Sequence, residues 1–413
     1  MANPFFVFIL TAMIVEHAIR ITANVLNLRS LRAEQPASLE GVYEPDDYRR
    51  SQEYLRTNTR FYFITSTISL AVLLSFWFSG GFNHLDQAVR SLGFAPIVNG
   101  LLYIGILAMG YSLVRLPSGI YRTFVIEERF GFNRTTGRTF VMDKLKGILL
   151  AVLIGVPLLS GVLALFEYTG YHAWIYCWIA FSLFSLALQY VAPNWIMPLF
   201  SKFIPLEEGE LREAILTYAH SVDFSIANVF VIDGSRRSTK SNAFFTGFGR
   251  NKRIALFDTL IRRHTATELV AVLAHEIGHH KRKHILQGTI IGILHAGLLF
   301  FILSIFLGST GLYDAFFMEQ QSIYSGIVFF GLLYRPLEMV LSVMVRALSR
   351  RNEYEADRFA ATTIQDPQYL VDALKRLSAG NLSNLTPHPF YVSLNYTHPP
   401  LLQRVRAIML NQT

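Results

Sequence analysis

The chain has 413 residues and a formal net charge of +8, and 52% of its residues are hydrophobic while only 16% are charged. A soluble domain carries about 25% charged residues, so this composition excludes an ordinary water-soluble enzyme and indicates a surface that largely faces lipid. Lysine and arginine lie between the apolar runs, without an aromatic–basic RNA motif, so we expect no nucleic-acid partner. The only cysteine, Cys177, lies in an apolar run and is interpreted as core packing.

The apolar runs are long enough to cross a bilayer, which takes about 20 helical residues. The first run lacks a basic start and a small-residue cleavage site, so we interpret it as an uncleaved span and not as a signal peptide. A proline within the fourth run, Pro157, predicts a kink there. Seven spans are expected, over about residues 4–26, 61–80, 96–116, 147–167, 173–193, 286–308 and 323–345.

Basic residues alternate between the two sides of these spans. The connections after spans one and three, the segment 200–285 and the tail after Val345 are rich in lysine and arginine, whereas the other three connections hold only Arg90. Lysine and arginine stay on the cytoplasmic side of membrane proteins. We therefore expect a multi-pass membrane protein with its N-terminus outside and its C-terminus and segment 200–285 in the cytoplasm.

Two segments are polar enough to lie outside the membrane. Residues 200–285 begin with a helical run, "EEGELREAILTYAHSV", and continue with "ANVFVID" and "KRIALFD" around "SNAFFTGFG", which predict short strands. Residues 346–413 are expected to be mostly helical, with a proline-rich loop near the end.

A histidine-rich helix closes the first of these segments, in "ELVAVLAHEIGHHKRKHILQG". His275 and His279 are four residues apart and project from one helix face, with Glu276 beside them. In this H-E-x-x-H pattern two imidazoles bind zinc and the glutamate activates a water molecule. His280 and His284 repeat the spacing without a carboxylate after the first histidine, so we interpret them as a basic face at the membrane interface.

A zinc site in a hydrolase needs a third protein ligand and one open position. A third histidine six residues after the motif is absent, because Ile285 stands there. The tail stretch "SRRNEYEADRFA" offers Glu353, Glu355 and Asp357 instead. Glu353 and Asp357 share a helical face, whereas Glu355 points elsewhere, so one face offers a ligand and an acceptor for an imidazole N–H. We take Glu353, which has the longer side chain, as the predicted ligand and Asp357 as the predicted acceptor. The alternative is a solvated helix whose acidic residues pair with neighbouring arginines.

The motifs together resemble the membrane gluzincins of the CAAX prenyl protease 1 family. The zinc helix, the following span pair and "LSRRNEYEADRFA" carry the resemblance. The shorter bacterial HtpX-type heat-shock proteases share the zinc core but are not expected to carry "EERFGFN" before the zinc helix. Four further stretches match in order: "EERFGFNRTT" (127–136), "APNWIMPLFSKFIPL" (192–206), "SNAFFTGFGRNKRIALFDTLI" (241–261) and "THPPLLQRVRAI" (397–408).

The resemblance implies features that spacing does not supply. His398, in "THPP", corresponds to a histidine that stabilises the oxyanion or positions the substrate, and Asn242 and Ala243 correspond to an edge strand that binds the substrate backbone. Without the resemblance, His398 would be interpreted as a loop residue and Asn242 as a turn residue. The implied fold is mostly α: a seven-transmembrane-helix protein enclosing a chamber, with a small zincin-like α+β catalytic portion.

These expectations divide the chain into four parts. Residues 1–199 form spans one to five with cytoplasmic loops, and 200–285 form a cytoplasmic catalytic unit with a β-hairpin and the H-E-x-x-H helix. Residues 286–345 form spans six and seven, and 346–413 form a helical catalytic segment with the third zinc ligand.

The expected function is that of an integral membrane zinc metalloendopeptidase with one Zn²⁺ per chain. Its expected substrates are prenylated CAAX-type or other membrane-associated peptides, cleaved near the C-terminus. The short loops favour a bacterial inner membrane. If the source is a eukaryote, the endoplasmic reticulum membrane is expected instead. In both cases the catalytic side is expected to be cytoplasmic. One alternative is a quality-control protease acting on unprenylated membrane proteins.

A transporter is the alternative from another class, because ionisable residues inside spans often mark pathways. Glu16, His17, Arg335 and Glu338 are the candidates. Arg335 and Glu338 are three residues apart and are expected to neutralise each other facing the chamber. A transporter or a non-catalytic scaffold has no need of Glu276, which is required only for catalysis.

Overall fold

The computed structural model describes residues 3–226, 228–246 and 253–410, and it is mostly helical. Among these residues six helices are long and apolar enough to cross a membrane, and a bent helix pair makes a seventh span if it is counted as one. The expected polytopic helical fold is thus confirmed. The six spans are Pro4–Arg29 (α1), Pro45–Phe78 (α2), Pro96–Glu127, Gly137–Tyr168, Gly170–Phe200 and His284–Phe306 (α12).

Three of these spans contain irregular turns. A π-helical turn lies just before Pro157, which lacks an N–H for a regular helical hydrogen bond. The parts of the three spans are α4 (Pro96–Tyr121), η2 (Arg122–Glu127), α5 (Gly137–Leu150), η3 (Ala151–Gly155), α6 (Val156–Tyr168), η4 (Gly170–His172), α7 (Ala173–Val191), η5 (Ala192–Ile196) and α8 (Met197–Phe200).

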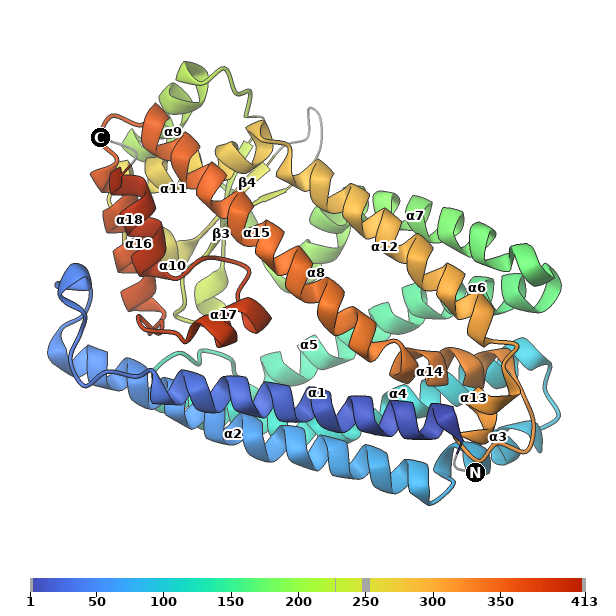
Figure 1. Cartoon of the computed structure of the whole chain (residues 1–413). Coiled ribbons are helices and arrows are strands. Elements are labelled where there is room, and N and C mark those ends of the chain that lie inside the picture. Colours follow the sequence, from blue (N-terminus) through green and yellow to red (C-terminus); the bar gives the residue numbers. More distant parts are fainter. Residues whose placement is uncertain (1–2, 227, 247–252, 411–413) are drawn as a thin grey trace.

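The seventh expected span is a broken helix. It consists of α14 (Ile323–Leu333) and α15 (Arg335–Thr363), which meet at an angle of 55°. Pro336, in the first turn of α15, accounts for the break, because its ring clashes with the carbonyl four residues earlier and it has no N–H to donate to that carbonyl. Helix α15 then continues well past the expected end of the span. It reaches the extramembrane portion near α11 (Ala266–Lys281) and α18 (Leu401–Leu410) (Figure 1).

The intramembrane charges pair differently from the sequence-based expectation. Arg335 lies 2.9 Å from Glu16 of α1, which also contacts Arg20 at 2.9 Å. Glu338 lies 3.0 Å from His295 of α12. The expected contact between Arg335 and Glu338 is therefore replaced by contacts between helices. Arg335 stands at the break between α14 and α15.

The extramembrane portion contains a small sheet of the order β1-β2-β4-β3 in the described residues. Strands β1 and β2 are antiparallel, β2 and β4 parallel, and β3 and β4 antiparallel. The expected strands in "ANVFVID" and "KRIALFD" are confirmed as β2 and β4, while the end of "SNAFFTGFG" lies outside the described residues. The strands are β1 (Phe203–Pro205), β2 (Asn228–Ile232), β3 (Ala243–Thr246) and β4 (Arg253–Phe257).

Helices surround this sheet, and two short helices, α3 (Gly81–Arg90) and α13 (Thr310–Asp314), lie at the opposite end of the molecule (Figure 1). Helices α16 and α18 lie beside α11 and α15, whereas α1 begins at the opposite end of the molecule, near α13 (Figure 1). The remaining elements are η1 (Ala37–Leu39), α3 (Gly81–Arg90), α9 (Glu210–Ser221), η6 (Gly234–Arg236), α10 (Asp258–Ile261), α11 (Ala266–Lys281), α13 (Thr310–Asp314), α16 (Gln368–Gly380), α17 (Pro389–Asn395) and α18 (Leu401–Leu410).

Helix α11 forms the centre of the extramembrane core. Leu269, Leu273 and Ile277 lie on one face of it and are at most 1% exposed. Gly278 allows a close approach to α15, because a Cβ atom there would lie 3.1 Å from both Cα and the carbonyl oxygen of Ala356. The start of α11 is fixed by a capping box, which satisfies backbone N–H groups at the first turn. The close packing of α11 on α15 brings the two predicted halves of the metal site together.

Candidate metal centre

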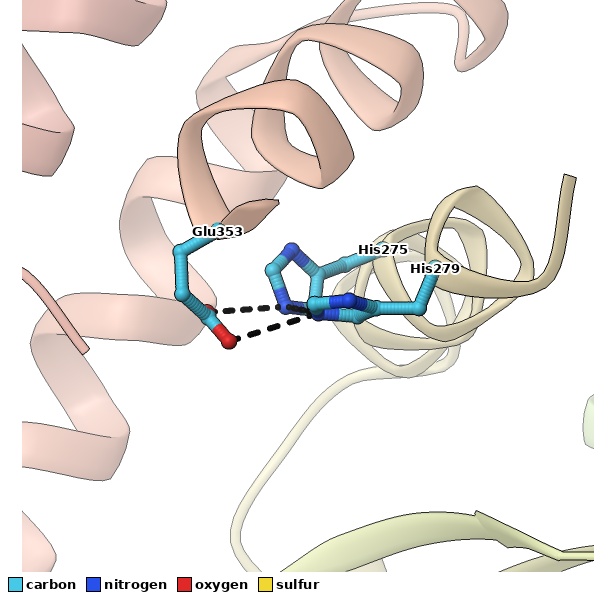
Figure 2. A group of neighbouring side chains, drawn as sticks. All are labelled: His275, His279 and Glu353. Atoms are coloured by element: carbon cyan, nitrogen blue, oxygen red, sulfur yellow. Dashed lines mark hydrogen bonds and ion pairs between the residues drawn. The ribbon is translucent and has the colours of Figure 1, made fainter. Parts of the chain in front are cut away.

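Three predicted ligands converge from two helices. The Nε2 atoms of His275 and His279 on α11 lie 3.1 Å apart. The carboxylate of Glu353 on α15 lies 3.3 Å from Nε2 of His275 and 3.4 Å from Nε2 of His279. Figure 2 shows this carboxylate facing both imidazole rings. One ligand atom from each residue lies within 4.8 Å of the others, so the three can reach a common ion.

The spacing and chemistry of these donors fit zinc. Zinc bonds to nitrogen or oxygen of about 2.0–2.1 Å in a tetrahedron place neighbouring donors roughly 3.3–3.4 Å apart. The observed separations are 3.1–3.4 Å. Oε2 of Glu353 is also buried without a hydrogen-bond partner among the described residues. A cation at this point would satisfy that oxygen, which otherwise carries a desolvation cost.

Asp357, the predicted acceptor of an imidazole N–H, lies beside His275. Oδ1 of Asp357 lies 2.9 Å from Nδ1 of His275, on the side of the ring away from the other ligands. This is the position predicted for an acceptor of the imidazole N–H. Burial lowers the pKa of His275, but the neighbouring carboxylates of Asp357 and Glu353 outweigh burial and raise the pKa to about 9. The environment therefore strongly favours a proton on this imidazole, or a cation in its place.

Arg404 is a site residue that the sequence-based reasoning missed. Its Nε and Nη2 atoms donate to the two oxygens of Asp357 at 2.8 and 2.6 Å, and Nη1 lies 3.7 Å from Glu353. Arg404 is 8% exposed and Asp357 1% exposed. A signal for it exists in the sequence, because Leu401, Arg404 and Ile408 share one face of α18, which places an arginine on an otherwise apolar stripe.

Glu276 and His398 border the ligands. Glu276 follows His275 on α11 and is half-buried, and burial raises the pKa of its carboxyl. A raised pKa suits a carboxylate that accepts a proton near neutral pH. Nε2 of His398 lies 3.2 Å from Oε1 of Glu353, while 62% of the His398 side chain is exposed. His398 thus reaches the site from its solvent-exposed side.

Strand β3 is the outer strand of the sheet in the described residues. Ala243 begins this strand and pairs with Leu256 of β4. Asn242 immediately precedes it and is exposed, and its carbonyl oxygen accepts a hydrogen bond from Phe257 N–H at 3.1 Å. The two residues therefore stand at the start of a strand edge, which is the kind of surface that pairs with an extended peptide.

The stretch "EERFGFNRTT" is tied to the entry of β3. Nζ of Lys240 lies 2.9 Å from Oε2 of Glu127 and donates to the Tyr54 hydroxyl at 2.7 Å. The same ammonium lies 4.3 Å from the centre of the Phe132 ring, a cation–π contact. Lys240 is thus held by α2, by the end of η2 and by the loop after it, and these contacts anchor the chain just before Asn242.

His280 and His284 do not form the common basic face that the sequence suggested. The ring of His280 packs on Phe224, with ring centres 5.2 Å apart. Nδ1 of His284 lies 3.0 Å from Nδ1 of His279, and the His284 side chain is 7% exposed. The interpretation of His284 as an interface residue is wrong, because the backbone changes direction between the two histidines.

Comparison with known proteins assigns this arrangement to a family. The protein-family model "CAAX prenyl protease N-terminal, five membrane helices" matches residues 24–202, and the model of peptidase family M48 matches residues 205–410. The CAAX prenyl protease 1 homolog of Arabidopsis thaliana is 35% identical over 420 residues, covering 99% of this chain and 98% of that protein. CAAX prenyl protease 1 of Saccharomyces cerevisiae is 34% identical over 401 residues, covering 90% and 88%.

A solved structure agrees over the whole fold. The structure titled "Crystal Structure of S. mikatae Ste24p" has a TM-score of 0.93 and 32% identity to this chain, covering 99% of this chain and 100% of that chain. A match of this extent includes the membrane helices as well as the extramembrane portion. The chain therefore belongs to peptidase family M48, among the CAAX prenyl protease 1 homologues, and is a multi-pass membrane metalloprotease.

Proposed function

We propose that the chain is a zinc-dependent endopeptidase that cleaves near the C-terminus of prenylated CAAX-type peptides. One Zn²⁺ per chain would be held by His275, His279 and Glu353. The observation that carries this proposal is the triangle of three donors at tetrahedral spacing, with one buried carboxylate oxygen lacking a hydrogen bond. Zinc, when bound, supplies Lewis-acid chemistry at the scissile carbonyl and at a water molecule.

The residues of the chain then divide the proton and charge handling between them. Glu276 takes the proton of the attacking water and delivers it to the leaving amine, which its raised pKa supports. His398 presents Nε2 at the open side of the site and donates to the developing oxyanion. Asp357 accepts the Nδ1 proton of His275 and so keeps Nε2 available as a ligand atom.

Substrate binding is proposed at the outer edge of β3. The peptide would lie extended along this edge, beside Asn242 and Ala243, and such pairing reads backbone and not side chains. The names of the relatives support a prenylated C-terminal peptide as the substrate. The charge distribution of the loops supports a cytoplasmic active site, in a bacterial inner membrane or, in a eukaryote, the endoplasmic reticulum membrane.

The test is cleavage of a farnesylated C-terminal peptide against an unprenylated peptide of the same sequence by the purified protein. We expect a higher kcat/KM for the farnesylated peptide and loss of both activities with a zinc chelator. Equal cleavage of the two peptides would favour a quality-control protease. Full activity in the chelator, after removal of bound metal is verified, would contradict the zinc mechanism.

A further inference from the structure

The backbone between the zinc helix and the next span has an unusual conformation. Helix α11 ends at Lys281 and α12 begins at His284, with Lys283 between them in the left-handed region at φ 59°. Non-glycine residues adopt this region at an energetic cost, and when they do the surrounding structure holds them there. In an unbroken helix, residues five apart point about 140° away from each other. The break instead turns His284 back onto His279.

His284 joins His279 to the acidic cluster of α15. Nδ1 of His284 lies 3.0 Å from Nδ1 of His279, and its Nε2 lies 3.4 Å from Oε2 of Glu355. Glu355 in turn accepts from Nε of Arg351 at 3.2 Å. The chain of contacts thus runs from a predicted metal ligand, through a buried imidazole, to a carboxylate that borders solvent.

The direction of each hydrogen bond follows from the ligand geometry. Nε2 of His279 faces His275 and Glu353, so as a ligand atom it carries a lone pair and the ring proton resides on Nδ1. That proton can be donated only if Nδ1 of His284 accepts it. The proton of His284 then resides on Nε2, where Glu355 is the acceptor. Only this assignment satisfies all three groups.

We propose that His284 and Glu355 are positioning residues for His279, and that they do for this ligand what Asp357 does for His275. Each metal-binding imidazole then has its Nδ1 proton held by a dedicated acceptor, which fixes the tautomer and the orientation of the ring. The two acceptors differ, because His275 uses a carboxylate neutralised by Arg404, whereas His279 uses a neutral imidazole backed by Glu355. Glu355 thereby gains a role that its place outside the Glu353–Asp357 face did not indicate.

This inference rests on the proposed metal site, so its test measures zinc affinity directly. The metal-free, full-length protein in detergent is titrated with Zn²⁺ in competition with a chelating dye. Loss of an outer hydrogen-bond partner typically weakens binding by about 10–100-fold, and we expect this for His284→Ala. His284→Asn should recover most of the affinity, because the asparagine Oδ1 takes the place of Nδ1 as acceptor.

A second pair of variants keeps the test decisive if His284→Ala fails to fold. Glu355→Ala should weaken zinc binding, and Glu355→Gln, which keeps an acceptor for Nε2–H, should bind more tightly than Glu355→Ala. Arg358→Ala, an exposed change one turn further along α15, is the matched control and should bind zinc like the wild type. The absorption spectrum of the Co²⁺-substituted protein should shift in the two alanine variants, because the ligand field changes with the orientation of His279.

The outcomes separate this inference from the metal site itself. A wild-type protein that binds no zinc would overturn both. Zinc affinity equal to that of the wild type in both His284→Ala and Glu355→Ala would overturn the positioning role and leave the metal site intact. Equal weakening in Ala, Asn and Gln variants would also overturn it, because acceptor chemistry would then not matter.

Discussion

Replacement of Asp357 by alanine tests two separate functions of one carboxylate. The side chain neutralises Arg404 through two hydrogen bonds of 2.6 and 2.8 Å, and it also faces Nδ1 of His275 at 2.9 Å. Breaking a buried ion pair by removing one partner costs about 3–5 kcal/mol. Glu353 remains 3.7 Å from Arg404 and offsets part of its charge. We therefore expect a loss of stability near the lower end, about 3 kcal/mol.

The double variant Asp357→Ala/Arg404→Met separates charge balance from ligand orientation. It removes both charges, and replacing a buried pair by apolar side chains is often close to neutral for stability. The acceptor for His275 Nδ1 is still missing, however. We expect the double variant to melt above Asp357→Ala, while both variants bind zinc about 10–100-fold more weakly than the wild type.

Two measurements decide the outcome, the thermal unfolding midpoint of the metal-free protein in detergent and the zinc dissociation constant by dye competition. Arg404→Met alone serves as the third corner of the cycle and should also lower the midpoint, because it leaves Asp357 without its guanidinium partner. Recovery of zinc affinity in the double variant would refute the hydrogen-bond role of Asp357. A double variant whose loss of stability equals the sum of the two single losses would refute the coupling of the pair.

Four further predictions concern the site and the topology. Purified protein should contain one zinc per chain by elemental analysis and lose proteolysis on chelation. Glu276→Gln should keep zinc but lower kcat by ~10²–10⁴-fold, because proton transfer by this side chain is lost. Glu353→Ala should lose zinc on dialysis, because a ligand atom is removed. Cysteines introduced at Glu208 and Asp314 should be labelled from opposite sides of the membrane.

Each of these results has a contrary outcome. Active protein without stoichiometric metal would exclude the first, and an active Glu276→Gln enzyme would exclude that residue as the base. Zinc retained by Glu353→Ala would mean that another carboxylate is the ligand. Labelling of both introduced cysteines from one side would show an even number of crossings between them, against the single crossing expected.

The membrane helices were predictable because lipid imposes a local rule. A spanning segment must satisfy its own backbone hydrogen bonds and be apolar over about 20 residues, so six spans follow from composition alone. The 55° bend between α14 and α15 does not follow from composition. Pro336 was visible in the sequence, but its effect depends on whether neighbouring contacts, such as Arg335 with Glu16, stabilise a broken helix.

The sequence by itself determined the family and the placement of His275 with His279 on one face, because these depend on a contiguous motif and on helical spacing. It also predicted Glu353 as the third ligand, from the length of its side chain and from the family pattern. Only the tertiary structure decided how charge is balanced around the site. Arg404 arrives from α18, and His284 arrives through a left-handed residue that reverses the expected direction of its side chain. The contact of Arg404 with Asp357 joins helices far apart in the chain. Periodicity marks Arg404 as lying on the apolar face of α18, but the partner it meets is set by close packing, such as that of Gly278 on α15.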